Sequence, residues 1–585
     1  MEKLTKLNNK RVLDIVNHYV ALCEPDCVTV IDDSDEDAAL LRTRALEGGE
    51  EHVLSMKGHT YHFDGVQDQA RDKAHTKLLV SKSVDFGFET AQLDRDTGLA
   101  EMKELLRGIM RGKEMFVRFC CLGPVNSPFS ILALQITDSA YVAHSEDLLY
   151  RRGYEAFRTA KDPDDFFVFI HSAGELVDGV TKNIDKRRIY VDLEGNRVFS
   201  INNQYAGNSV GLKKLAFRLA IQRAHREGWL AEHMFLMGVH GNHGRVTYFS
   251  GAYPSACGKT STAMIPGQSI VGDDIIYARR FGGELRAVNV ERGIFGIIEN
   301  VNAGDDPEIF NVLTHEGECI FSNVLISDDG VPYWTGSDVE PPAAGGKHFT
   351  GRWTPAMKDV PVSHKNARYT IGLESLANRD PALHDPMGVR LEAMIYGGRD
   401  SDTSVPVLEA KSWAHGVLLG ACIESETTAA TLGQEGVRKH NPYANLDFMT
   451  LPLSRYVDDH LKLEEQLEKT PKVFVTNYFL RDVNGRFLNH KLDKKVWILW
   501  AEARVHGEVE AIETPVGNIP KYEDLVPLFK SALGRDYARS DYEAQFAIRV
   551  DKYRAKWNRM KDIFSKLEMP AKFVDELNAQ IERLR

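Results

Sequence analysis

The sequence predicts an α/β protein with more than one domain, and three observations support this fold class. First, its 585 residues exceed what one hydrophobic core normally holds, so two or three domains are expected. Second, short apolar runs typical of buried strands, 116–122 and 130–136, occur among amphipathic helical patterns. Third, predicted strands at 234–238 and 246–249 lead into a loop of small residues, an order found in phosphate-binding α/β folds.

Composition excludes several classes of protein. Hydrophobic residues make up 43% of the chain and charged residues 27%, as in ordinary globular proteins, and the net charge of −12 argues against a nucleic-acid partner. The seven cysteines are too irregularly spaced for a disulfide framework. The first residues lack the apolar core of a signal peptide, and no apolar run approaches the roughly eighteen residues of a membrane span. We therefore expect a cytoplasmic protein without a membrane partner.

A helix is predicted from about Gly211 to Glu227, with Lys213 and Lys214 in its first turn. Two cations there oppose the helix dipole and repel each other, which suggests that they serve a ligand. We place a domain boundary near residue 225, which divides the chain into 1–225 and 226–585. The remaining predicted elements are a buried strand at 269–272, a surface loop at 396–404, a mobile lid at about 424–436 and helices in the last sixty residues.

The clearest chemical motif is Tyr253-Pro-Ser-Ala-Cys-Gly-Lys-Thr-Ser261. A loop ending in Gly-Lys-Thr can close its backbone N–H groups around a phosphate, with the lysine on the outer phosphates and the threonine on a cation. Tyr253 stands where the usual motif has glycine, so the triplet could merely begin a helix. Asp273 and Asp274, which follow the strand at 269–272, could meet a metal held by the loop. Together these elements predict that the chain handles a nucleoside triphosphate or a similar phosphoryl donor.

Several segments together resemble the GTP-dependent phosphoenolpyruvate carboxykinases, in the same order along most of the chain from about Arg71. This resemblance implies the two-lobed α/β fold of that family, with mixed sheets, a variant P-loop, an N-terminal substrate-binding domain and a C-terminal nucleotide-binding domain. The segments that carry it are the loop 253–261, Gly272–Ile275, Glu227–His233, Tyr205–Ser209 with Lys213 and Lys214, His364–Arg368, Tyr396–Arg399 and Ser412–Gly416.

Carried over position by position, the resemblance implies that Lys214, His233 and Asp274 bind the catalytic metal, usually Mn2+. A second divalent ion, Mg2+ or Mn2+, would accompany the nucleotide on Thr260. A lysine can bind a metal only as the neutral amine, so its pKa must be lowered by Lys213 and by the cation itself. Without the resemblance, the two lysines would be read as a solvated helix face and His233 as a structural histidine.

The same comparison implies roles for a further set of residues, since arginine pairs bidentately with carboxylate and phosphate. Catalytic roles fall to Lys213, Cys257, Lys259 and Arg368, although we interpret Cys257 as a loop residue rather than a nucleophile. Substrate would be bound by Arg71, Tyr205, Ala206, Gly207, Ser255, Asn366 and Arg368, with Ala206 where the family usually has glycine. Nucleotide would be bound by Ala256, Cys257, Gly258, Lys259, Thr260, Ser261, Arg368, Arg399, Tyr478, Phe479 and Phe487.

The implied reaction is the reversible conversion of oxaloacetate and GTP to phosphoenolpyruvate, CO2 and GDP, as used in gluconeogenesis or anaplerosis. Metal-assisted decarboxylation would give an enolate, whose oxygen attacks the γ-phosphoryl group while Lys259 and Arg399 take up charge. Closure of the predicted lid would protect the enolate from protonation by water. We expect a monomer.

One segment departs from the family. Asn489–Lys494 replaces the Pro-Gly-Phe-Gly-Glu-Asn segment that belongs to the guanine pocket, while Tyr478, Phe479 and Phe487 match its aromatic clamp. The same chemistry with ATP, ITP or pyrophosphate therefore stays open. A P-loop small-molecule kinase would share the loop without needing the metal site, and a silent nucleotide-binding regulator would show no turnover.

Overall fold

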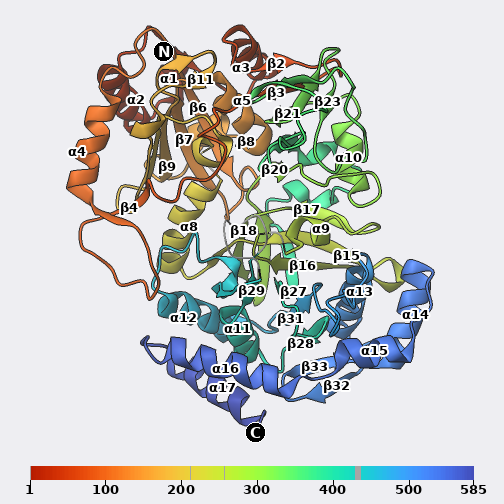
Figure 1. Cartoon of the computed structure of the whole chain (residues 1–585). Coiled ribbons are helices and arrows are strands. Elements are labelled where there is room, and N and C mark those ends of the chain that lie inside the picture. Colours follow the sequence, from red (N-terminus) through yellow and green to blue (C-terminus); the bar gives the residue numbers. More distant parts are fainter. Residues whose placement is uncertain (1, 211–212, 256, 428–435) are drawn as a thin grey trace. The chain divides into compact units, whose positions relative to one another are not determined.

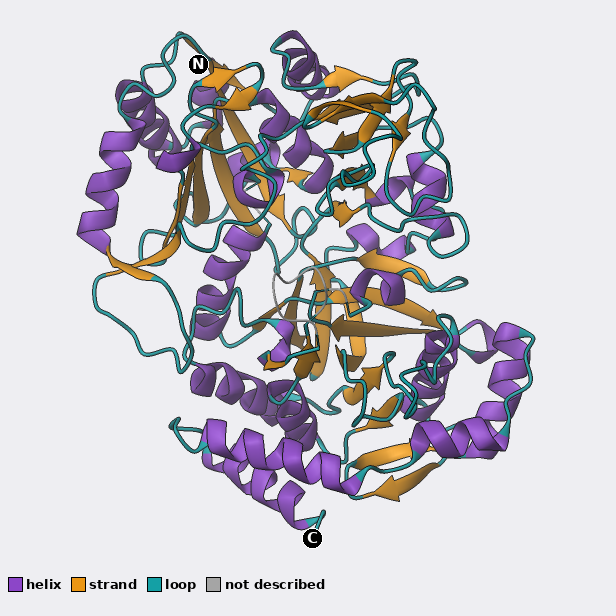
Figure 2. Cartoon of the chain, in the orientation of Figure 1, coloured by secondary structure: helices purple, strands orange, loops and turns teal. Residues whose placement is uncertain are grey.

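The computed structural model describes residues 2–210, 213–255, 257–427 and 436–585. Contacts divide the chain into two compact units, each of which combines mixed sheets with helices, as the predicted α/β class requires (Figure 1, Figure 2). The first unit contains Met1–Asp85, Glu89–Gln222 and Val290–Arg379. The second contains Phe86–Phe88, Arg223–Asn289 and Asp380–Arg585.

A nine-stranded mixed sheet organises the first unit. Its strand order is β1 (Cys27–Val30), β6 (Glu114–Leu122), β7 (Ile131–Thr137), β9 (Phe166–Ser172), β13 (Arg197–Ile201), β12 (Arg188–Asp192), β4 (Thr76–Val80) and β5 (Gln92–Asp94), with β8 (Arg151–Arg152) beside β6. Strand β6 is parallel to β1 and antiparallel to β7. The predicted strands at 116–122 and 130–136 are thus confirmed as β6 and β7.

Both faces of this sheet are buried under helices. Met115, Val117 and Phe119 of β6 join the core formed with α1 (Glu2–Leu7), α2 (Lys10–Cys23) and α4 (Arg95–Leu106). Phe116 instead packs with residues of α3 (Asp35–Glu47) and α5 (Ala140–Leu149). Successive side chains of a strand point to opposite faces, so one apolar run supplies two cores. This is why the run reads as continuously hydrophobic.

The first unit also contains two smaller sheets. The five-stranded sheet has the order β2 (His52–Val53), β3 (His59–His62), β21 (Cys319–Ser322), β26 (Arg368–Gly372) and β20 (Gly293–Ile297). A four-stranded sheet contains β23 (Pro332–Tyr333), β22 (Leu325–Ser327), β24 (Gly346–His348) and β25 (Gly351–Trp353). The short helix α7 (Ala206–Ser209) follows β13. Strands far apart in the sequence therefore pair directly, as β3 and β21 do in parallel.

The second unit is built on an eleven-stranded mixed sheet. Its main path runs through β14 (Leu230–Glu232), β18 (Ile276–Phe281), β19 (Glu284–Asn289), β27 (Val389–Gly398), β31 (Lys472–Asn477), β28 (Val407–Glu409), β33 (Gly517–Pro520) and β32 (Ala511–Thr514). Strand β16 (Val246–Ala252) lies between β27 and β15 (Phe235–His240), and β15 pairs in turn with β17 (Ser269–Gly272). The predicted strands at 234–238, 246–249 and 269–272 are confirmed as β15, β16 and β17.

The helices of the second unit are mostly C-terminal, and the prediction of helices in the last sixty residues is confirmed (Figure 1). They are α11 (Trp413–Ala421), α12 (Leu453–Leu463), α13 (Asp493–Val505), α14 (Tyr522–Leu533), α15 (Arg539–Phe546), α16 (Val550–Phe564) and α17 (Ala571–Glu582), with the short α9 (Lys259–Ala263) after β16. Within the described residues, none of the helices combines the length and the apolarity that crossing a bilayer requires.

Two sequence predictions need adjustment. The predicted helix 211–227 is α8 (Lys214–Glu227), so Lys213 precedes the helix, and 211–212 lie outside the described residues. The predicted loop 396–404 is wrong for Tyr396–Gly398, which are the last residues of β27. These residues pair with β31 on one side, and Tyr396 also pairs with β16 on the other, so backbone pairing in the sheet outweighs the turn tendency of the glycines. Most of the predicted lid, 428–435, also lies outside the described residues; β29 (Glu424–Glu426) and β30 (Arg438–His440) flank it as an antiparallel pair.

Candidate functional site

The segment 253–261 leaves the buried strand β16 and enters α9 at Lys259. Gly258 has φ 97°, a conformation that side chains other than glycine rarely adopt, so the glycine is required for the turn. The hydroxyls of Ser261 and Thr262 donate to the Gly258 carbonyl, at 3.2 and 2.7 Å. The loop therefore has a fixed exit into the helix. Ser255 is exposed, and Ala256 lies outside the described residues.

Tyr253 explains why the loop departs from the usual motif. Its buried ring stacks between Phe235 and Tyr478, each at 6.0 Å between ring centroids. Its hydroxyl lies 2.8 Å from the Thr476 hydroxyl and 2.9 Å from that of Tyr478. Burial raises the pKa of Tyr253 well above its ordinary value, so this hydroxyl stays neutral. Tyr253 thus belongs to the aromatic support beneath the loop.

Three of the predicted residues meet behind this loop, and we call Lys259, His233 and Asp274 the P-loop group. The register of β14 and β18 pairs Glu232 with Ile276, which brings the next residue, His233, near Asp274. Asp274 Oδ1 accepts from Lys259 Nζ at 2.6 Å and lies 3.0 Å from His233 Nε2. Lysine Nζ also donates to the Asp274 carbonyl at 2.8 Å. Strand pairing therefore brings together residues that are 41 positions apart.

The donor set of this group suits a divalent transition metal. Imidazole nitrogen and carboxylate oxygen are both ordinary ligands for such ions. His233 Nδ1 faces the Ala444 carbonyl at 3.1 Å, so the other ring nitrogen, Nε2, is the one directed toward Asp274. Both Asp273 and Asp274 are buried. The predicted third ligand, Lys214, begins α8 in the first unit and stays a sequence prediction.

The predicted base-binding aromatics lie beside Arg399. The Arg399 guanidinium sits 3.8 Å from the centre of the Phe479 ring, a close cation–π contact. Phe479 and Phe487 are in edge contact at 6.5 Å; Phe487 is 52% exposed, and the Arg481 guanidinium lies 4.4 Å from the centre of its ring. Tyr478 differs from both, because its hydroxyl lies 3.2 Å from the Thr262 hydroxyl in addition to its contact with Tyr253. Its polar end therefore braces α9.

Ser425 is a residue of this region that the sequence motifs did not identify. Its hydroxyl lies 3.1 Å from the Cys257 sulfur and accepts from the Arg399 backbone N–H at 3.3 Å. Ser425 therefore joins the P-loop to the residue after β27. Burial raises the pKa of the Cys257 thiol, although Ser425 and Arg399 oppose this effect. A neutral, buried thiol is a poor nucleophile, which agrees with the interpretation of Cys257 as a loop residue. No local pattern around Ser425 could have signalled this contact.

In the first unit, hydrogen bonds link the segments that carry several predicted substrate residues, and we call Arg71, Tyr205–Gly207, Asn366 and Arg368 the arginine group. The buried carboxylate of Asp68 accepts from the backbone N–H groups of Gln204 and Tyr205, at 2.7 and 3.1 Å. Asn208 donates to the Ala70 carbonyl at 3.0 Å. These contacts hold the segment that carries the exposed Arg71 against the start of α7. Asp68 and Asn208 were not predicted from the sequence.

Tyr205 and Arg368 share one aromatic neighbour. The Phe295 ring lies 6.2 Å from the Tyr205 ring and 4.9 Å from the Arg368 guanidinium. A Cβ added to Gly207 would come within 2.3 Å of the Tyr205 ring, so glycine is required there. Ala206 is buried and has no left-handed backbone, so the alanine is accommodated at this position without conformational strain.

Asn323 links the loop that precedes Arg368 to the segment that precedes Arg71. Its side chain bonds to both the backbone N–H and the carboxylate of Asp64, at 2.9 and 2.7 Å. Its carbonyl accepts from the His364 N–H at 3.1 Å, at the start of the segment that contains Asn366. Lys213 makes an ion pair with the buried carboxylate of Glu291. The predicted substrate segments are thus linked by buried amides and carboxylates.

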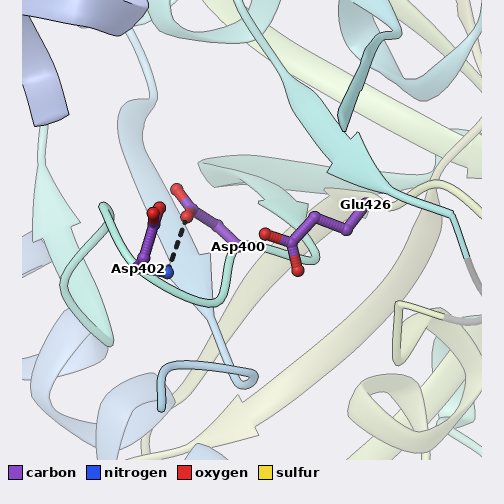
Figure 3. Close-up of side chains that lie close together, drawn as sticks. All are labelled: Asp400, Asp402 and Glu426. Carbon is purple, nitrogen blue, oxygen red and sulfur yellow. Dashed lines mark hydrogen bonds between the residues drawn. The ribbon is translucent and has the colours of Figure 1, made fainter. Parts of the chain in front are cut away.

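A separate acidic cluster in the second unit has the geometry of a cation site. Carboxylate oxygens of Asp400, Asp402 and Glu426 lie within 4.8 Å of one another (Figure 3). Arg438 Nη2 reaches all three, at 3.0, 2.7 and 2.9 Å, and Lys552 adds a further pair to Asp402 at 2.7 Å. Because a guanidinium already supplies the positive charge, we interpret the cluster as an ion-pair network that ties β30 to the end of β29 and the loop after β27.

A buried strand, a loop closed by glycine, a helix that begins with lysine and a facing carboxylate define a protein of the P-loop nucleotide-binding class. Comparison with known proteins gives the family. Residues 229–583 match the phosphoenolpyruvate carboxykinase C-terminal P-loop domain, and residues 14–225 match the N-terminal domain of the same family. The chain therefore belongs to the phosphoenolpyruvate carboxykinase family.

Individual relatives cover the chain almost completely, and each is named phosphoenolpyruvate carboxykinase [GTP]. The protein of Pyrococcus horikoshii is 53% identical over 100% of this chain and 95% of its own length. That of Thermococcus sibiricus is 54% identical over 96% of this chain and 91% of its own. A more distant relative, from Chlamydia muridarum, is 32% identical over 98% of both chains. The resemblance read from the motifs is confirmed.

Proposed function

We propose that the chain catalyses the GTP-dependent conversion of oxaloacetate to phosphoenolpyruvate and CO2, with GDP as the second product. The observation that carries this proposal is the 53% identity over the whole chain to a relative named for this activity, together with the P-loop group. We further assign residues 1–225 to a substrate-binding domain and residues 226–585 to a nucleotide-binding domain that also supplies Ser255, Asn366 and Arg368 to the substrate, in a cytoplasmic monomer. The activity is that of a decarboxylating lyase that serves gluconeogenesis or anaplerosis.

A divalent metal, which we propose to be Mn2+, would be held by His233 and Asp274, with Lys214 as the ligand expected from the sequence. When bound, this ion supplies Lewis-acid stabilisation of negative charge on an enolate oxygen. His233 supports the assignment because its Nδ1 is held by a backbone carbonyl, which leaves Nε2 for a ligand. A second divalent ion would accompany the nucleotide on Thr260.

The chain's own residues would position and neutralise the nucleotide phosphates. Lys259 carries an ammonium at the start of α9, where it can move from Asp274 to the outer phosphates. Arg399, held over Phe479, would compensate charge on the γ-phosphoryl group during transfer. Ala256, Gly258 and Ser261 would complete the loop, and Phe479 and Phe487 would contact the base.

Arg71, Asn366 and Arg368 would bind the carboxylates of oxaloacetate and the transferring phosphoryl group, and Tyr205–Gly207 and Ser255 are the other substrate residues expected from the sequence. Their support is the buried set of hydrogen bonds from Asp68, Asn208 and Asn323, which fixes three distant segments before substrate arrives. Lys213, paired with Glu291, would provide a positive charge near the adjacent lysine.

The direct test measures oxaloacetate-dependent formation of phosphoenolpyruvate with Mn2+ present, and compares GTP, ATP, ITP and pyrophosphate as donors. We expect GTP and ITP to be preferred, because both present a 6-oxo purine. Preference for ATP or pyrophosphate would overturn the donor but keep the chemistry. No product with any donor would instead favour a small-molecule kinase or a silent regulator.

The metal assignment is tested by Asp274→Asn, which removes the ligand charge with little change of shape. Turnover at limiting Mn2+ should fall by about 100-fold or more. Asp536→Asn, at an exposed ion pair with Lys530 in the same unit, is the matched control and should leave turnover unchanged. Near-normal turnover of Asp274→Asn would contradict the assignment.

A further inference from the structure

The loop that faces His233 has an unusual backbone. Tyr443 and Ala444, the last residues of the short 3-10 turn Pro442–Ala444, both have left-handed φ angles, 54° and 53°. This region is unfavourable for residues other than glycine, because Cβ comes too close to the following carbonyl oxygen, and here two consecutive residues adopt it. Such strain persists only where the surroundings impose it, and it accumulates at functional sites.

Tyr443 is fixed from several sides. Its ring is fully buried and stacks on His460 at 4.4 Å, with an edge contact to Tyr396 at 5.7 Å. Its hydroxyl donates to the Val417 carbonyl of α11 at 3.1 Å. These contacts hold the side chain in one place, so the backbone at Tyr443 and Ala444 must accept the strained conformation.

A second network ties this loop to the strand that precedes His233. The buried Tyr456 hydroxyl lies 2.8 Å from Glu232 Oε1 and 3.2 Å from the Ala231 carbonyl, both in β14. The same hydroxyl accepts from Asn445 Nδ2 at 2.9 Å. His460 Nε2 lies 2.9 Å from the same Glu232 oxygen. The Tyr456 hydroxyl on α12 therefore links strand β14 to Asn445, the residue that follows Ala444.

These contacts determine the orientation of the His233 ring and which of its nitrogens carries a proton. The Ala444 carbonyl, 3.1 Å from Nδ1, can only accept a hydrogen bond, so Nδ1 must carry a proton. Phe448 contacts the ring at 5.1 Å and limits its rotation. Asp274 Oδ1, 3.0 Å from Nε2, is also an acceptor, so Nε2–H donates to it. A bound ion would replace that proton, and the proton held on Nδ1 makes Nε2 the coordinating atom.

We propose that Tyr456 and the strained pair Tyr443 and Ala444 are positioning residues of His233. They set the tautomer and orientation of its ring through the Ala444 carbonyl, and thereby raise the affinity of the site for a divalent transition metal. The functional consequence rests on the proposed metal site, whereas the orientation of the ring does not.

The orientation is measured without metal or turnover. In protein labelled with 15N-histidine, the Nδ1–H of His233 should give a protected signal, assigned by its loss in His233→Gln. Tyr456→Phe, which removes one hydroxyl, should accelerate exchange of this proton by about tenfold or more. Tyr248→Phe is the matched control in the same unit: its hydroxyl bonds to Asp380 at 3.3 Å, away from His233, and its loss should leave the signal unchanged.

Metal affinity is measured separately by Mn2+ titration. Tyr456→Phe should weaken Mn2+ binding by about 10- to 100-fold, and Tyr443→Phe, which loses only the bond to Val417, by less. The milder variant keeps the test decisive if Tyr456→Phe does not fold. Equal exchange rates for the wild-type chain, Tyr456→Phe and Tyr443→Phe would overturn the positioning role. If His233→Gln bound Mn2+ like the wild-type chain, the proposed metal site would fail instead, and proton exchange would still decide the orientation.

Discussion

The P-loop group and the arginine group are supported by different kinds of interaction. Beneath the P-loop, aromatic rings and neutral hydroxyls pack together, with Tyr253 at their centre. The arginine group depends on buried carboxylates and amides, such as Asp68 and Asn323. The residues of the P-loop are adjacent in sequence, so packing beneath the loop is enough to support them. The segments of the arginine group are far apart in sequence, so directional hydrogen bonds are needed to fix their relative positions. The two groups should therefore respond differently to substitution.

The largest effect is expected for Lys259→Ala. Removing the ammonium eliminates charge compensation at the transferring phosphoryl group and should lower kcat by about 100- to 1000-fold. Steady-state formation of phosphoenolpyruvate measures this change, and circular dichroism checks the fold. Lys530→Ala, at an exposed ion pair of the same unit, is the control. A loss below tenfold would mean that Lys259 mainly supports structure.

Asp68→Asn should weaken substrate binding by the arginine group without affecting nucleotide binding by the P-loop. The variant loses the charge that pairs with Arg187 at 2.7 Å and places an amide NH2 beside either the guanidinium or the backbone donors. We expect KM for oxaloacetate to rise by about tenfold. Binding of GDP should not change. Asp328→Asn, at an exposed pair with Arg352, serves as the control. Equal losses of GDP and oxaloacetate binding would contradict the separation of the two groups.

A pH effect is expected in the first unit. His144 on α5 lies between the carboxylates of Glu51 and Glu318, at 2.7 and 3.0 Å, near the start of β21. Burial lowers the pKa of His144, but the two carboxylates raise it more, to about 10. Because the folded pKa lies above the ordinary value of about 6.5, the stabilisation is complete below that pH and is lost as pH rises toward 10.

Thermal unfolding between pH 7 and 9.5 tests this expectation. The midpoint for the first unit should fall as pH rises, and His144→Gln should flatten the slope while lowering the midpoint at pH 7. Hydrogen exchange at 140–149 and at 246–252, corrected for intrinsic rates, separates the units. An unchanged slope in the variant would show that other groups govern the pH dependence.

The smallest effect is expected for Cys257→Ser. The hydroxyl can keep the contact with Ser425, and the raised pKa of the thiol argues against a nucleophilic role. Turnover should stay within about threefold of the wild-type value. A decrease of 100-fold would require a direct chemical role for the sulfur.

The sequence by itself determined the fold class, the P-loop and the family, because these depend on local patterns: apolar strands, a glycine that permits the turn at Gly258, and a lysine that follows it. The strand at 269–272 was predictable for the same reason. Tyr396–Gly398 were not, since pairing within the sheet outweighed the local glycine signal.

Only the tertiary structure decided which residues support the site. Asp68, Asn323, Ser425 and Tyr456 act through partners far away in the chain, and their residue types are common at surfaces and in cores alike. Hydrogen bonds are short and directional, so their partners are known only when strand pairing has fixed the backbone. The sequence specifies the groups that carry charge, and the fold determines what holds them in place.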